Sequence, residues 1–174
     1  ADQRGAAPVS LDVSVTWDRP ASAGDSEHWL AVSLAGAQGS NAQRALVILV
    51  DTSTSMVGDR LERARVAVAA AVLSCGPADR VLVVGFGSAL TRAAVVAGGS
   101  DVAGALMSLA AAGKTRLDLA LDEADRWLRS QPGRRQVLLL TDGDPTDAEG
   151  RRVSGEPFVG RAAELGAAGV RLMV

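Results

Sequence analysis

The stretch ALVILVDTSTSM, residues 45–56, joins two patterns that decide the fold. It begins with the continuous apolar run Leu46–Val50, which is typical of a strand buried on both faces of a sheet. It ends with the carboxylate of Asp51 and the hydroxyl residues Thr52–Ser55. A buried strand that runs directly into oxygen-bearing side chains suggests a ligand site at the end of that strand.

The chain beyond this stretch alternates strand patterns with helical ones. Apolar residues at helical spacing predict helices over 59–75, 102–109, 116–131 and 158–165. Apolar runs predict strands over 81–86, 136–141 and 170–174, with a short edge strand within 89–97. This alternation predicts an α/β fold, a doubly wound and mostly parallel sheet with helices on both faces.

The N-terminal part has a different pattern. Residues 9–17 alternate apolar and polar side chains, as do residues 30–34, and a polar loop separates them. Alternation with period two predicts half-buried strands, so we expect an antiparallel hairpin here. The predicted domains are a hairpin extension with its linker, residues 1–43, and an α/β domain, residues 44–174.

Composition excludes several classes of function. The net charge of −2 gives no basis for nucleic-acid binding, and no apolar run approaches the roughly 20 residues of a membrane span. Cys75 is the only cysteine, which excludes a disulfide framework and a cysteine zinc site, and we expect it to be buried.

The lone cysteine and the absence of a signal sequence favour the cytoplasm, although a removed signal would allow an extracytoplasmic location. The arginine-rich, lysine-poor composition indicates a bacterial protein.

Oxygen-bearing residues converge at one edge of the predicted sheet. Asp51–Ser55 follow one buried strand, Asp142 follows another, and Thr115 precedes a helix. Ligands of open α/β sheets bind at the carboxyl ends of the strands. Two bare carboxylates about 4 Å apart would repel by about 4 kcal/mol at an effective dielectric constant of about 20. A hard divalent cation, Mg²⁺, Mn²⁺ or Ca²⁺, would remove that cost.

These residues resemble the metal-ion-dependent adhesion site of the von Willebrand factor type A family. The resemblance rests on Asp51-x-Ser53-x-Ser55, Thr115 and Asp142-Gly143 in this order, and it extends over residues 45–174. It implies that Ser53 and Ser55 bind the metal through their hydroxyls. Thr115, Asp51 and Asp142 would act directly or through water. The implied metal is Mg²⁺ or Mn²⁺, with Ca²⁺ less suited, and the implied partner is a protein that presents Glu or Asp to it.

Other interpretations of the same residues stay open. Asp51–Ser55 suit a turn with a helix cap, and Thr115 suits a cap of the next helix. A metal-dependent hydrolase or phosphotransferase with Asp51 as nucleophile is an alternative function, although no general base accompanies the site. We therefore expect no enzyme. A metal that only stabilises the fold is a third possibility.

Several further residues carry smaller expectations. Thr54 stands where many family members have Gly, and its side chain need not face the metal. Asp144 and Asp147 are expected to be turn or cap residues, and His28 to lie in a loop. Met56 is expected to pack in the core. The aspartates of the third helix, Asp118, Asp122 and Asp125, are expected on solvated faces.

The final predicted strand, residues 170–174, is apolar on both faces like a central strand. Members of the family usually continue with a helix, a strand and a last helix. The resemblance therefore implies that the domain lacks its last strand and helices, as a trimmed piece of a longer protein would. Either the hairpin of residues 9–34 folds back on this region, or another chain or segment supplies the missing elements, and we favour the second.

Overall fold

The computed structural model describes residues 11–17, 30–36, 43–95, 102–143 and 145–174. The chain divides into two compact units, Ala1–Asn41 and Ala42–Val174, and each is described by itself. In the first unit, strands β1 (Leu11–Trp17) and β2 (Leu30–Gly36) pair antiparallel, which confirms the predicted hairpin. Val9, the predicted start of the first strand, lies outside the described residues.

The second unit contains a five-stranded sheet. Its strands are β3 (Arg44–Asp51), β4 (Arg80–Phe86), β5 (Leu90–Val95), β6 (Arg134–Leu140) and β7 (Val170–Met173). The spatial order is β5-β4-β3-β6-β7. All neighbours pair in parallel except β4 and β5, which pair antiparallel at one edge. The sheet confirms the predicted mostly parallel α/β fold.

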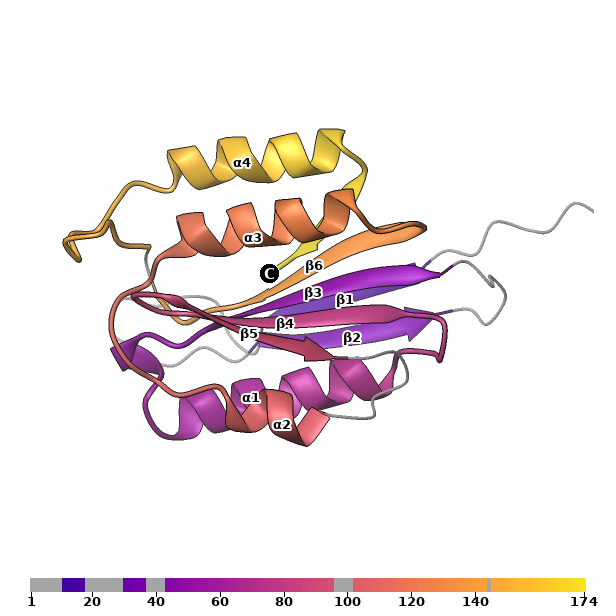
Figure 1. Ribbon diagram of the computed structural model, residues 1–174, viewed down its shortest axis with the longest axis horizontal. Coiled ribbons are helices and arrows are strands. Elements are labelled where there is room, and N and C mark those ends of the chain that lie inside the picture. The colour runs from indigo at the N-terminus through magenta and orange to yellow at the C-terminus, as the bar shows by residue number, and fades with distance from the viewer. Residues whose placement is uncertain (1–10, 18–29, 37–42, 96–101, 144) are drawn as a thin grey trace, which may run out of the picture. The chain divides into compact units, whose positions relative to one another are not determined.

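The described helices lie on both faces of this sheet. They are α1 (Asp59–Leu73), α2 (Val102–Met107), α3 (Leu117–Arg129) and α4 (Glu156–Ala167). Figure 1 shows α1 and α2 on one face and α3 and α4 on the other. None of the helices in the described ranges has the length and apolar character that a membrane crossing requires.

Strand β3 explains why its sequence is a continuous apolar run. Leu46, Ile48 and Val50 pack in the cluster that contains the buried residues of α1. The alternate residues, Val47 and Leu49 among them, pack in the cluster that contains the buried residues of α3. Both faces of β3 are therefore core, and each position along the run must be apolar.

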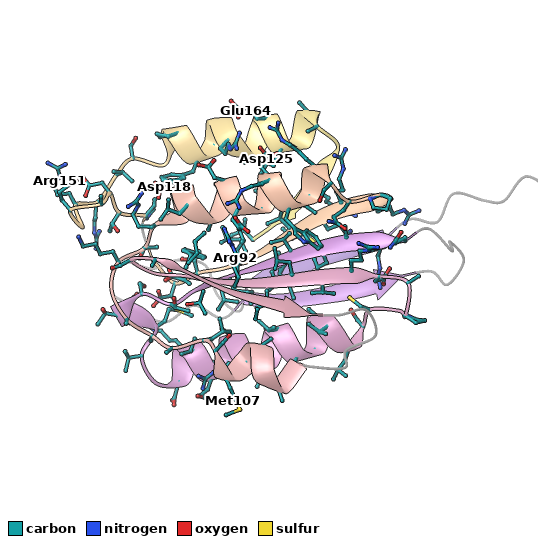
Figure 2. All side chains as sticks on the ribbon, in the orientation of Figure 1. Arg92, Met107, Asp118, Asp125, Arg151 and Glu164 are labelled. Carbon is teal, nitrogen blue, oxygen red and sulfur yellow. The ribbon has the colours of Figure 1, made fainter. Side chains whose placement is uncertain are left out.

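Asp125 is buried, so the expectation that it is solvated is wrong. Only 8% of the residue is exposed, and one carboxylate oxygen accepts hydrogen bonds from Arg129 at 2.7 Å and from Arg161 of α4 at 2.9 Å. Figure 2 labels it on α3. The hydrogen bond from Arg129 is the main cause that holds the pKa of Asp125 below its usual value. Its partner on α4, 36 residues away, explains why helical periodicity alone misplaced it.

Two smaller expectations also need correction. β7 lies at an edge of the sheet rather than in its centre, with Val170 buried and Arg171 exposed. Cys75 is only half-buried, and its thiol donates to the carbonyl of Ala71 one turn earlier.

Candidate metal centre

Asp51 organises the loop that follows β3. It is the last residue of the strand and is fully buried. Its Oδ1 accepts the backbone N–H of Ser53 at 2.7 Å, and its Oδ2 accepts the hydroxyl of Thr141 at 2.6 Å. One carboxylate therefore fixes both the turn after β3 and the residue that follows β6.

A row of oxygens leads from this loop to the end of β6. Ser53 Oγ lies 2.9 Å from Ser55 Oγ, and Ser55 Oγ donates to Asp142 Oδ1 at 2.8 Å. Ser53 is buried, whereas Ser55 is exposed, so the row runs from the interior to the surface. The structure thus brings together four of the five predicted ligands, Asp51, Ser53, Ser55 and Asp142.

Thr115 lies in a loop next to the one that follows β3, but within the part of the chain that the structure describes it makes no hydrogen bond to the oxygen row. The residue is buried, and its backbone N–H donates to Thr146 Oγ1 at 3.0 Å. Its loop is joined to the loop after β3 because Ala112 N–H donates to the carbonyl of Thr52 at 2.7 Å. No hydrogen bond of the Thr115 hydroxyl is found among the described residues.

Thr54 ties these two loops together. Both its backbone N–H and its hydroxyl donate to the carbonyl of Gly113, at 3.1 and 3.0 Å. Gly113 has φ of +84°, a conformation that glycine adopts without strain. At Gly87, a Cβ would lie 2.6 Å from the carbonyl oxygen of Ala112, so only glycine fits there. Thr54, at a position where many members of the family have Gly, therefore holds the loop that contains Gly113.

The cap interpretation does not account for these residues. Ser53 precedes the short 3-10 helix η1 (Thr54–Met56), but its side chain makes no capping hydrogen bond. The N-cap of α3 is Arg116, not Thr115, and no side chain caps that helix. The turn interpretation is correct for Asp51, whose carboxylate accepts the N–H two residues on. Met56 is buried in the core, as expected.

The sequence patterns did not point to two residues at the site, Thr141 and Arg60. The hydroxyl of Thr141 donates to Asp51, and only its position directly before Asp142 could have indicated that it belongs to the site. Arg60, in the first turn of α1, places Nη1 2.6 Å from Asp142 Oδ2 and 3.3 Å from the carbonyl oxygen of Ser55. Nothing in the local sequence indicates this contact, because Arg60 and Asp142 are 82 residues apart.

The loop after Asp142 has a structural role. Asp147 Oδ1 accepts the backbone N–H groups of Glu149 and Arg151 at 3.0 and 2.9 Å, which confirms it as a turn residue. Asp144 and His28 lie outside the described residues.

The spacing of the oxygen row is compatible with a divalent cation, and it is also the spacing of ordinary O–H···O hydrogen bonds. Neighbouring oxygens around an octahedral Mg²⁺ with bonds of about 2.0–2.1 Å lie about 2.8–3.0 Å apart. The separations from Ser53 Oγ to Ser55 Oγ and from there to Asp142 Oδ1 are 2.9 and 2.8 Å. Across the described ranges, no group of three or more His, Cys, Asp or Glu side chains could hold a metal ion. The candidate centre instead combines two carboxylates with three hydroxyls, and hard cations favour oxygen donors.

These features define an α/β domain with oxygen-bearing side chains gathered where two parallel strands end. The sequence profile of the von Willebrand factor type A domain matches residues 46–144, more than half of the chain. The chain belongs to this family. A search among curated proteins found no match.

Solved structures with this fold include three informative neighbours. The manganese-loaded TRAP protein of Plasmodium vivax is 24% identical, with a TM-score of 0.59 over 77% of this chain and 57% of that chain. A von Willebrand factor type A protein from Catenulispora acidiphila is 18% identical, with a TM-score of 0.59 over 98% of this chain and 41% of that chain. The vWF domain of the pili tip protein Mfa5 from Porphyromonas gingivalis is 18% identical, with a TM-score of 0.56 over 62% and 40%. The chain therefore spans only about half the length of these proteins, and the likeness shows the fold.

Proposed function

We propose that the chain is a divalent-metal-dependent protein-interaction module. Its metal, Mg²⁺ or Mn²⁺, would be held by Asp51, Ser53, Ser55, Thr115 and Asp142. Domains of this family are typically protein-interaction modules, and one structural neighbour is manganese-loaded. The observation that carries the proposal is the row of oxygens from Ser53 to Asp142, spaced at 2.9 and 2.8 Å.

The donor set suggests how a partner would bind. Hydroxyl oxygens are neutral, so an ion held mainly by Ser53, Ser55 and Thr115 keeps most of its positive charge. Asp51 is fully buried and already accepts two hydrogen bonds, which suits an orienting role behind the hydroxyls. Ser55 is exposed, so the outer side of the ion would face solvent. A Glu or Asp carboxylate from a partner protein is the ligand that such a site favours.

The proposal includes no enzymatic activity. A nucleophilic carboxylate must reach its substrate, whereas Asp51 is 0% exposed and has both oxygens engaged.

Titration calorimetry tests the proposal. After chelator treatment, the wild-type chain should bind one Mg²⁺ or Mn²⁺ with a Kd between about 1 μM and about 1 mM, because hydroxyl-rich ligation is modest in strength. Ser53→Ala should abolish this binding. It should change the free energy of unfolding in EDTA by less than about 1 kcal/mol, since it removes one hydroxyl contact and keeps the backbone N–H bound to Asp51.

Ser74→Ala is the matched control for Ser53→Ala. The Ser74 hydroxyl donates to the carbonyl of Ala71 at the end of α1, so its loss should leave metal binding unchanged. No heat of binding in the wild type, or equal binding by Ser53→Ala, would contradict the proposed function.

A further inference from the structure

The Asp142 carboxylate already has a cation beside it. Arg60 Nη1 lies 2.6 Å from Asp142 Oδ2, and the same nitrogen donates to the carbonyl of Ser55 at 3.3 Å. The other carboxylate oxygen, Oδ1, accepts the Ser55 hydroxyl. Both oxygens of Asp142 are therefore engaged, one by a guanidinium and one by a hydroxyl of the candidate metal centre.

A guanidinium and a divalent ion that both lie beside Asp142 repel each other, so the presence of one raises the free energy of binding the other. Arginine stays protonated at every physiological pH, so Arg60 brings a permanent positive charge to the oxygens that would hold the metal. Like charges a few ångströms apart repel, and both cations compete for the charge of one carboxylate. The Arg60 side chain is 47% exposed and that of Asp142 is 17% exposed, so water and salt reach this pair and screen the competition in part.

The Arg60 side chain is partly exposed to solvent. It is 47% exposed, and it lies in the first turn of α1 with solvent on one side. Partly exposed ion pairs contribute little to stability, so a divalent ion can displace this one. The released side chain would keep its charge in water.

We propose that Arg60 is an internal counter-ion of the metal site, which neutralises Asp142 while no divalent ion is bound and gives way when one binds. The inference rests on the proposed function, since it takes the oxygen row as the place of the ion. Arg60 then lowers the affinity of the site for metal, and it sets the divalent concentration at which the site fills.

The test compares Mn²⁺ affinity by calorimetry in the wild type and in Arg60→Gln. Glutamine keeps the length and polarity of the side chain but removes the charge. We expect Kd to fall by about fivefold, the upper end of what an exposed ion pair usually contributes. The difference should shrink in 0.5 M NaCl, because salt screens both the ion pair and the repulsion. Arg60→Lys, which keeps the charge, should stay within about twofold of the wild type.

Arg63→Gln is the control on the same helix. Its side chain is 49% exposed, close to the 47% of Arg60, and it lies 3.9 Å from Asp59. Its Mn²⁺ affinity should match that of the wild type. Unchanged or weaker binding by Arg60→Gln, with normal binding by the wild type, would overturn the counter-ion role and leave the proposed function standing. Absence of binding in the wild type and all variants would overturn both.

Discussion

Replacing Thr141 with valine removes a hydroxyl that contacts Asp51 and also lies 3.4 Å from both the backbone N and the carbonyl oxygen of Gly143. In the structure this hydroxyl donates to Asp51 Oδ2 at 2.6 Å, and Asp51 is fully buried. Hydrogen bonds to charged groups contribute about 1.5–3 kcal/mol, and a charged group that loses a donor without replacement costs more. We therefore expect Thr141→Val to lower the free energy of unfolding in EDTA by about 2 kcal/mol. For a domain of this size that lowers Tm by about 4–8 °C.

Thr141→Val should also weaken Mn²⁺ binding. Loss of a hydrogen bond that orients a residue of a metal site typically costs about 10- to 100-fold in affinity. Urea unfolding and calorimetry measure the two effects, and Thr141→Ser, which keeps the hydroxyl, is the matched control. The reasoning is refuted if Thr141→Val unfolds within about 0.5 kcal/mol of the wild type, or if the serine variant loses as much as the valine variant.

Two further predictions concern the fold. Burial by itself would raise the pKa of Asp79, but hydrogen bonds from Arg44 and Gly76 outweigh it and hold the pKa below its usual value. The charged form therefore stabilises the fold above about pH 4, and this contribution disappears as the pH falls below that value. Asp79→Ala should flatten the loss of stability between about pH 5 and pH 2 in acid-unfolding curves; an unaltered slope would contradict this. Gly87→Ala should lower the free energy of unfolding in urea by about 1–3 kcal/mol, because the new Cβ would lie 2.6 Å from the Ala112 carbonyl oxygen. Gly155→Ala is the control: its Cβ would meet no atom within 4 Å, so it should lower the free energy of unfolding by less than about 1 kcal/mol.

Local patterns predicted the fold well because each element carries its own signal. The run Leu46–Val50 is apolar since both faces of β3 are core. The sequence predicted helix α3 because Leu121, Ala124 and Leu128 repeat at helical spacing, and all three are buried. The family resemblance was drawn over residues 45–174, and the sequence profile matches residues 46–144 of that stretch.

Local sequence patterns could not predict contacts between residues that are far apart in the chain. The burial of Asp125 depends partly on Arg161 of α4, and the engagement of Asp142 depends on Arg60 of α1. Neither pair shares a helix turn or a strand register, so no periodicity links them. Four predicted ligands form one hydrogen-bonded group, but the position of Thr115 outside that group was also beyond the sequence pattern.

The central claim is that the oxygen row at the end of β3 holds a divalent ion. A crystal of the chain soaked in Mn²⁺, with anomalous diffraction data, tests it directly. The account predicts one anomalous peak within coordination distance of both Ser53 Oγ and Ser55 Oγ, and no such peak in Ser53→Ala. The absence of a peak there at saturating Mn²⁺, or a peak only at the carboxylates of Asp147 and Glu149 in the loop before α4, would contradict it.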